Sequence, residues 1–330
     1  MVRPGVICQL LLLPLAACTL PGSVALDPAL ERVAYHTPGG EASPAREVGY
    51  VTADGSRLGY LEYRAREPRG ALVYLHGIES HAGWFAAAAD ALCAAGFDVY
   101  CLDRRGSGIN RENRGFISGH VDRYEILLED IETVVQDLRS RYARLYMIGL
   151  SWGGKLALAY SLTHPGELDG LVLITPGLVA RVRPGLLDLA GILLCAGPFP
   201  TAQFETPIEP EMFTETPEVL EKLRRDPLRL RYASARFFYQ SLRLDGLVDD
   251  LIGQNRCPIE LFLAGKDQII DNEAVLELLR RGAGGPLKEV LYEDQTHSIQ
   301  FDATDRLVRD MVAWIENVCP GAFEKPSEQE

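Results

Sequence analysis

Short apolar runs alternate with longer amphipathic segments through most of the chain. The runs predict strands at 70–77, 97–103, 144–150, 169–176, 258–265 and 287–293. The longer segments between and after them predict helices at 83–96, 121–142, 152–165, 272–282 and 304–318. Strands that are apolar on both faces and alternate with helices are typical of a parallel sheet buried between helices. The pattern therefore predicts an α/β fold.

Two segments depart from this alternation. Two extended runs surround the turn signal Asp54-Gly55 and predict a hairpin before the first buried strand. From about 177 to 246 the alternation stops, and an apolar stretch at 185–199 is followed by helical patterns at 216–226 and 231–244. We expect this segment to be a helical cap that is inserted between two strands of the sheet and covers Ser151. The apolar stretch either forms an apolar lid or packs the cap onto the sheet.

The N-terminus has the features of an export signal. Residues 1–17 carry one arginine and an apolar core that is too short for a comfortable membrane span. Leu15-Ala16-Ala17-Cys18 resembles a bacterial lipobox, which predicts a lipoprotein signal peptide and a lipid anchor on Cys18. Cleavage after Ala25 or a retained apolar anchor are the alternatives. We therefore expect an exported lipoprotein of a bacterial cell envelope, periplasm-facing or in the outer membrane.

The rest of the chain divides into three parts. Residues 18–46, rich in proline, glycine and alanine, predict a tether. Residues 47–319 predict one α/β domain that includes the cap, and 320–330 a solvated tail.

Charge and cysteine content argue against several kinds of partner and of structural site. The formal net charge is −13, which argues against nucleic acid and against electrostatic attraction to anionic membrane surfaces. The seven cysteines include no C-x-x-C pair, so neither a zinc site nor a disulfide framework is indicated. A disulfide among Cys195, Cys257 and Cys319 stays open, because an exported chain enters an oxidising compartment.

The stretch "MIGLSWGG" places a serine between two glycines where a predicted strand meets a predicted helix. Gly149-x-Ser151-x-Gly153 in this position fits a nucleophile elbow, in which the serine occupies a strained turn and side chains beside it would clash. A serine hydroxyl needs a base to remove its proton, and the base needs an acid to orient it. We therefore expect Ser151 to be a nucleophile with two partners downstream.

Two residues at later strand ends meet this need. Asp267 follows the strand 258–265, and His297 follows the strand 287–293. The order serine, aspartate, histidine is the one that α/β-hydrolases use. Asp271 and Asp294 are rival acids, but Asp271 is placed to cap the helix at 272 and Asp294 to form a turn. We therefore predict a triad of Ser151, Asp267 and His297.

Acyl transfer through this triad also needs donors for a negatively charged oxygen. The backbone N–H of Trp152, at the start of the helix after Ser151, is one candidate, because the helix dipole adds to its effect. The backbone N–H of Ile78 is the second, because Gly77 lets the chain turn after the strand 70–77. No metal or organic cofactor is needed.

Several segments together resemble a known family. "HGIESHAGWF", "DRRGSG", "GLSWGG", "GKDQIID" and the segment of His297 are similar to the monoacylglycerol lipases and lysophospholipases, α/β-hydrolases related to the serine aminopeptidase-like hydrolases. The resemblance runs from about Val48 to Val318. It implies that His81 and the turn at 103–108 are structural supports. Trp152, where a smaller residue such as methionine is commoner, and Ser80, where glutamate is typical, depart from the family pattern.

The resemblance implies a serine hydrolase of the α/β-hydrolase fold that cleaves carboxylic esters of lipids, with monoacylglycerol or lysophospholipid as substrate. A peptidase or amidase with the same triad is one alternative, and a non-catalytic envelope interaction protein is another. All three triad positions are occupied by the expected residues, which argues against the non-catalytic protein.

Overall fold

The computed structural model describes residues 46–282 and 284–318. The predicted signal peptide, Cys18, the tether up to residue 45, Cys319 and the predicted tail lie outside the described residues. In the described ranges no helix is both long and apolar enough to span a membrane.

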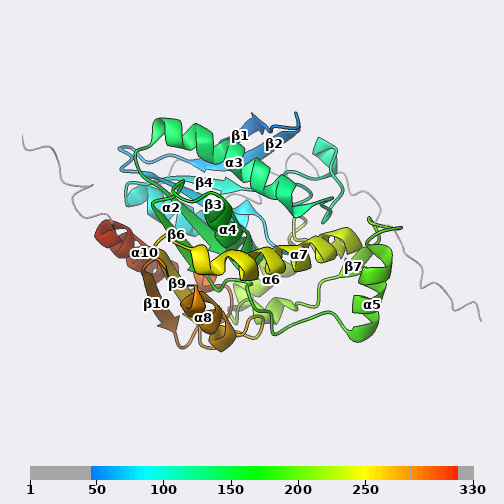
Figure 1. Ribbon diagram of the computed structural model, residues 1–330. Helices are drawn as coiled ribbons and strands as arrows, with labels where there is room; N and C mark the ends of the chain where they lie inside the picture. Colours follow the sequence, from blue (N-terminus) through cyan, green and yellow to red (C-terminus); the bar gives the residue numbers. More distant parts are fainter. Residues whose placement is uncertain (1–45, 283, 319–330) are drawn as a thin grey trace, which may run out of the picture.

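An eight-stranded sheet forms the centre of the molecule (Figure 1). Its strands are β1 (Arg46–Val51), β2 (Arg57–Tyr63), β3 (Ala71–Leu75), β4 (Asp98–Leu102), β5 (Leu145–Leu150), β6 (Gly170–Ile174), β9 (Ile259–Ala264) and β10 (Leu287–Tyr292). They lie in the order β1-β2-β4-β3-β5-β6-β9-β10. The predicted hairpin β1–β2 is antiparallel, as is the pair β2–β4, and the remaining pairs are parallel. The predicted mostly parallel sheet is confirmed.

Helices cover both faces of this sheet. One face carries α2 (Ala86–Ala94) and α10 (Thr304–Val318), and the other carries α3 (Tyr124–Arg141), α4 (Trp152–Thr163) and α8 (Asn272–Arg281). Shorter helices are η1 (Ala82–Phe85), η2 (Glu112–Arg114), η3 (Pro210–Met212), η4 (Ile252–Gln254) and α9 (Ile299–Asp302). Alternate residues of β3 enter opposite cores, Val73 the first and Leu72 and Tyr74 the second. A strand buried on both sides must therefore be apolar throughout, as the sequence is here.

The segment between β6 and β9 forms the predicted insertion. It contains α5 (Leu186–Cys195), β7 (Gln203–Glu205), α6 (Pro217–Arg225), β8 (Tyr232–Ser234) and α7 (Ala235–Leu251). The predicted end at 246 falls inside α7, so the insertion continues beyond it. The helix predicted from 231 begins only at Ala235, because β8 pairs with β7 and the Ser234 hydroxyl caps the helix by accepting the N–H of Phe237 at 3.1 Å.

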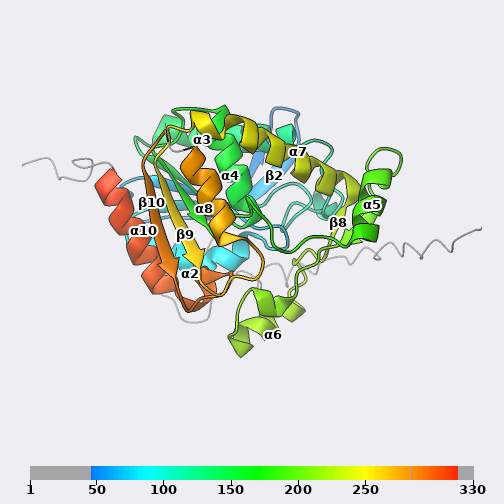
Figure 2. The same cartoon turned by 60° about the horizontal axis from the view of Figure 1, so that its bottom comes forward.

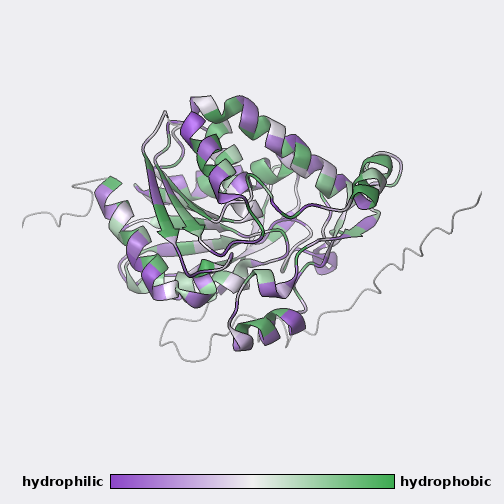
Figure 3. Cartoon of the chain, turned by 90° about the horizontal axis from the view of Figure 1, so that it is seen from below, coloured by the Kyte–Doolittle hydropathy of each residue, from purple (hydrophilic) through white to green (hydrophobic). Residues whose placement is uncertain are grey.

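Helix α5 lies at the outer end of the insertion and presents an apolar face to solvent (Figures 2 and 3). Ile192 is buried on the side of α5 that packs against α7. Leu186 and Leu187 are 88% and 89% exposed, and Leu194 is 75% exposed. These leucines face solvent and do not pack the insertion onto the sheet.

Buried polar contacts fasten the insertion to the loop after β3. The Glu79 carboxylate accepts hydrogen bonds from the Arg229 guanidinium, with 2.7 Å from Nε to Oε2, and from the Thr206 hydroxyl. The Glu79 carbonyl accepts the N–H of Leu230 at 2.9 Å. Burial raises the pKa of Glu79, and Arg229 and Thr206 counteract that rise. The carboxylate therefore depends on these partners to remain charged.

A second cluster lies beside the first. The Asp226 carboxylate meets His81 Nε2 at 2.9 Å and accepts the indole N–H of Trp84 at 2.5 Å. Burial acts against ionisation of Asp226, but His81 and Trp84 lower its pKa to about 2. The histidine and the insertion are thus joined by a structural contact, as the resemblance implied for His81.

Breaking the Glu79–Arg229 pair tests how firmly the insertion is held. We expect Arg229→Met to lower the free energy of unfolding in urea by about 3 kcal/mol, because it leaves a buried carboxylate without its cation. Arg225→Met on the solvent-facing side of α6, where the arginine side chain is 80% exposed, is the control and should change it by less than about 0.5 kcal/mol.

The pH dependence of the same measurement separates lost charge pairing from lost packing. Without Arg229 the pKa of Glu79 in the folded state rises further above its unfolded value, so falling pH favours the folded variant. The stability deficit should therefore be smaller at mildly acidic than at mildly alkaline pH. An equal deficit at both would contradict the ion-pair account.

Candidate active site

Ser151 sits in a backbone conformation that few residues adopt. It joins β5 to α4 with φ of 53° and ψ of −125°, and its exposed fraction is 7%. Its N–H donates to the carbonyl of Ile174 at 3.0 Å, and its own carbonyl accepts the N–H groups of Gly154 and Gly177 at 2.8 and 2.7 Å. Surrounding hydrogen bonds therefore hold the strained turn in place.

The neighbouring glycines are required by space. A Cβ on Gly153 would lie 2.2 Å from the carbonyl oxygen of Leu75, and one on Gly149 would lie 2.6 Å from the Cα of Gly154. A Cβ on Gly77 would lie 3.1 Å from the Cβ of Ser151, so the loop after β3 also approaches the serine closely. This is the geometry expected of a nucleophile elbow.

The structure brings the two predicted partners together. His297 Nδ1 lies 2.8 Å from Asp267 Oδ2, and both side chains are fully buried. The other carboxylate oxygen of Asp267 accepts the N–H groups of Ile269 and Ile270 at 2.8 and 3.1 Å. A carboxylate on Nδ1 holds that nitrogen protonated and leaves Nε2 free to accept a proton. His297 Nε2 has no hydrogen-bond partner in the part of the chain that the structure describes.

The residues at the end of β6 form hydrogen bonds with both His297 and Ser151. Thr175, which follows the strand, donates its hydroxyl proton to the carbonyl of His297 at 2.9 Å, and the preceding carbonyl, that of Ile174, binds the N–H of Ser151. Phe213 of the insertion packs its ring against the imidazole, with centroids 6.1 Å apart, and its carbonyl accepts the N–H of Ser298 at 2.9 Å. Phe213 could not be predicted from the sequence, because no periodic pattern in the insertion marks a residue that reaches the site.

The rival acids have other places. Asp271 caps α8, where its carboxylate accepts the N–H of Ala274 at 3.2 Å. Asp294 is exposed. His164 ends α4, where its ring stacks on Tyr160 with centroids 4.3 Å apart. None of these residues contacts His297 or Asp267 in the contacts recorded for the described ranges.

The two predicted oxyanion donors flank the serine. Trp152 is the first residue of α4, and Ile78 follows the glycine that approaches Ser151. Neither backbone N–H donates to another group of residues 46–282 or 284–318. Both are thus available to an oxygen that develops negative charge beside Ser151.

Comparison with known proteins identifies the family of the chain. A family model described as serine aminopeptidase, S33, matches residues 66–304. The chain belongs to this family.

Individual relatives resemble the chain over different lengths. A monoacylglycerol lipase of Mycolicibacterium smegmatis is 27% identical over 291 residues, which cover 83% of this chain and 98% of that protein. Lysophospholipase L2 of Escherichia coli is 28% identical over 144 residues, 41% of this chain and 42% of that protein.

A solved structure confirms the fold. A soluble variant of monoglyceride lipase from Saccharomyces cerevisiae, in complex with a substrate analog, matches with a TM-score of 0.74 at 19% identity, covering 86% of this chain and 98% of that one. The predicted α/β-hydrolase fold and the resemblance to monoacylglycerol lipases are confirmed. The relatives also support the predicted class, a carboxylic ester hydrolase.

The two residues that depart from the family pattern, Trp152 and Ser80, both lie close to Ser151. The indole N–H of Trp152 donates to the Ser241 hydroxyl of α7 at 2.9 Å, and its ring lies 5.0 Å from that of Phe237. Ser80 Oγ is buried without a hydrogen-bond partner among the described residues. A Cβ placed on Gly77 would lie 3.3 Å from Ser80 Oγ and 3.5 Å from Ser151 Oγ, so both hydroxyls border the same glycine.

The turn at 103–108 supports the site from behind. The buried carboxylate of Asp103 accepts the N–H groups of Ala82 and Ile109 at 2.7 and 2.9 Å. Gly108 has φ of 49°, and a Cβ there would lie 1.9 Å from Asp103 Oδ2. Arg105 binds both oxygens of Asp130 at 2.6 Å. These contacts agree with the structural role implied for this turn in the S33 family.

The described cysteines stand apart from this chemistry. Cys93, Cys101, Cys195 and Cys257 are free thiols, and Cys319 lies outside the described residues. Burial raises the pKa of Cys93 to about 12 and that of Cys101 well above its usual value. Neither thiol forms a reactive thiolate at neutral pH.

Exchanging each candidate acid for its amide tests the assignment of Asp267. Asp267→Asn should lower kcat for an ester by about 10⁴-fold, because an amide no longer holds His297 in the tautomer that accepts a proton. The matched control is Asp271→Asn, which should keep kcat within about twofold because asparagine caps helices as well as aspartate does. The opposite ranking of the two variants would assign the acid to Asp271.

Proposed function

We propose that this protein is a serine hydrolase that cleaves carboxylic esters of lipids, with monoacylglycerols or lysophospholipids as its substrates. The observation that carries the proposal is the pairing of His297 with Asp267 beside a strained Ser151. This combination supplies a nucleophile, a base and an orienting acid without a further group.

The reaction follows from these positions. Ser151 Oγ adds to the ester carbonyl carbon while its proton passes to His297 Nε2, and the carbonyl oxygen becomes an oxyanion that accepts the N–H groups of Ile78 and Trp152. Collapse of this intermediate breaks the bond to the alcohol, which takes the proton from His297. Water then adds to the acyl-enzyme through the same base, and the fatty acid leaves with Ser151 restored.

Two features favour lipid esters. The exposed leucines of α5, such as Leu186 and Leu187, give the insertion a surface that fits apolar chains. The relatives named above are lipases and a lysophospholipase. A lipid anchor on Cys18, as predicted from the sequence, would place the enzyme beside such substrates, and mass spectrometry of the N-terminal peptide of the cellular protein tests it.

A peptidase or amidase is the second candidate, because the family model is described as a serine aminopeptidase. The same triad attacks amides, so the geometry of Ser151, His297 and Asp267 does not separate the two. Rates on an ester and an amide with the same acyl group do. We expect the ester to be cleaved and the amide to be cleaved far more slowly.

Fatty-acid release from monoacylglycerol is the direct test. We expect the purified protein to release fatty acid, and Ser151→Ala to reduce the rate by about 10⁶-fold, which is the loss of the whole triad as a unit. Ser107→Ala, a buried serine in the turn after β4, is the control for removal of a hydroxyl and should retain activity. Circular dichroism verifies that each variant is folded.

The outcomes discriminate among the candidates. Equal release by wild type and Ser151→Ala would rule out the serine mechanism. Cleavage of an amide with no cleavage of the matched ester would leave the mechanism and replace the substrate class.

A further inference from the structure

Arg104 is a cation beside the site that the mechanism above does not use. It follows β4, is partly buried, and removal from water lowers its pKa to about 9, so it stays protonated at neutral pH. The neighbouring Arg105 forms ion pairs with Asp130 and Asp54. The recorded hydrogen bonds of the Arg104 guanidinium instead go to the loop after β3, which carries Ile78.

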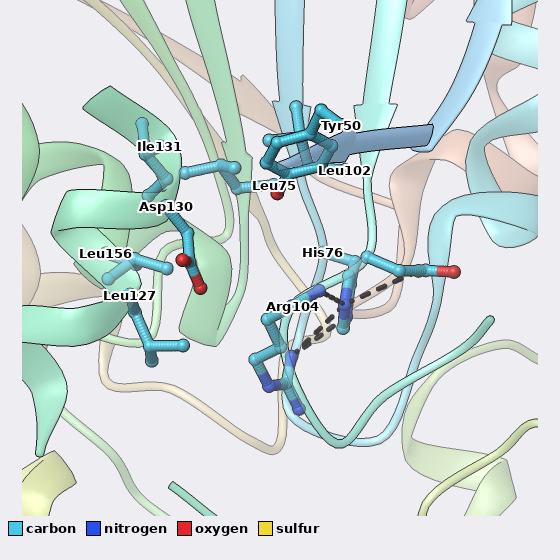
Figure 4. Close-up of a pocket in the computed structure, with 10 residues that line it drawn as sticks. Tyr50, Leu75, His76, Leu102, Arg104, Leu127, Asp130, Ile131 and Leu156 are labelled. Carbon is cyan, nitrogen blue, oxygen red and sulfur yellow. Dashed lines mark hydrogen bonds and ion pairs between the residues drawn. The ribbon is translucent and has the colours of Figure 1, made fainter. Parts of the chain in front are cut away.

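Two carbonyl groups of this loop accept its hydrogen bonds. Arg104 Nη1 donates to the carbonyl of Gly77 at 2.8 Å, and Nη2 donates to the carbonyl of Ile78. Figure 4 shows Arg104 and His76 facing each other at the edge of a small pocket. His76 Nε2 accepts the backbone N–H of Arg104 at 3.3 Å, and its Nδ1 lies 2.8 Å from the Gly77 carbonyl.

The protonation of His76 agrees with this arrangement. Burial and the neighbouring Arg104 hold the pKa of His76 well below its usual value, so the ring is neutral. Arg104 Nη1 also lies 2.9 Å from His76 Nδ1, so the guanidinium contacts the imidazole as well as the Gly77 carbonyl. The Gly77 carbonyl therefore accepts a charge-assisted hydrogen bond beside a neutral imidazole.

The carbonyl of Gly77 and the N–H of Ile78 belong to one peptide group. No cis peptide bond occurs in the described ranges, so the carbonyl and the N–H of this group point in opposite directions. The hydrogen bonds that hold the Gly77 carbonyl therefore also set the direction of the Ile78 N–H. A charge-assisted hydrogen bond also polarises the peptide, which makes its N–H a stronger donor.

Arg104 also lies against the side chain of Trp152, the residue that presents the other oxyanion donor. The guanidinium carbon lies 5.1 Å from the centroid of the Trp152 ring and 5.5 Å from that of Phe237. A cation over an indole face is attracted to it. The same arginine thus touches the loop that presents the Ile78 N–H and the side chain of the residue that presents the other N–H.

We propose that Arg104 is a positioning residue of the oxyanion hole, which aims and polarises the N–H of Ile78 through the Gly77 carbonyl and braces Trp152 through its ring. This proposal rests on the proposed ester hydrolysis by Ser151. A positioning role differs from a purely structural one because Arg104 would then stabilise the transition state without changing substrate binding.

Three variants test it with a soluble short-chain p-nitrophenyl ester. Arg104→Met keeps an unbranched stem as long as that of arginine up to Nε and removes the guanidinium with all its donors, and it should lower kcat by about 10- to 100-fold with KM changed less than about threefold. Arg104→Lys keeps the charge but has only one donor nitrogen, which cannot reach both carbonyls as the two guanidinium nitrogens do, and it should restore part of the loss. Arg105→Met, in the same turn but bound to Asp130, should lower stability and leave kcat within about threefold.

A trifluoromethyl ketone gives an independent reading. Ser151 adds to its carbonyl reversibly, and the resulting oxyanion occupies the oxyanion hole. Its inhibition constant should rise in Arg104→Met by about the factor by which kcat falls, because both depend on the same donors.

Each outcome decides the matter. Unchanged kcat and inhibition constant in folded Arg104→Met, or an equal loss in Arg105→Met, would overturn the proposal. If Arg104→Met does not fold, full kcat in Arg104→Lys would overturn it, and a partial loss with matched weakening of the inhibitor would support it. A folded wild type that neither cleaves the ester nor binds the ketone would refute the proposed function itself.

Discussion

The backbone of Ser151 is the constraint on which the site depends. A residue other than glycine at φ of 53° costs about 1–3 kcal/mol and persists only where its surroundings enforce it. Here the end of β6 binds the N–H of Ser151, two glycine N–H groups bind its carbonyl, and Gly153 leaves room for the backbone of β3. The stability of the sheet therefore offsets the strain. The strained backbone conformation places the Ser151 side chain beside the loop after β3.

The insertion is part of the site and not only a cover over it. Phe213 packs on His297, Arg229 neutralises Glu79 in the loop of the oxyanion hole, and Ser241 binds the indole of Trp152. Three separate segments of the insertion thus reach the base, the loop that carries Ile78, and Trp152. A shift of the insertion would therefore disturb catalytic geometry as well as access.

The sequence predicts the sheet and the triad because both depend on short local signals. Strands buried on both faces read as apolar runs, and Ser151, Asp267 and His297 each follow such a run. The Asp267–His297 contact then follows from strand order, since β9 and β10 are parallel neighbours. Contacts of the insertion were not predicted, because Glu79 with Arg229 and Trp84 with Asp226 are joined across more than a hundred residues without a periodic pattern. The start of α7 was misplaced because β8 pairs with a strand that the sequence does not reveal.

Covalent labelling measures the central claim, a serine activated by His297, most directly. The protein would be mixed with a fluorophosphonate and the adduct located by intact mass and peptide mapping, beside a His297→Ala variant. The account predicts one adduct per chain, on Ser151, and a labelling rate that falls by orders of magnitude without the histidine. An adduct on another serine, no adduct on folded protein, or equal labelling of the His297→Ala variant would contradict it.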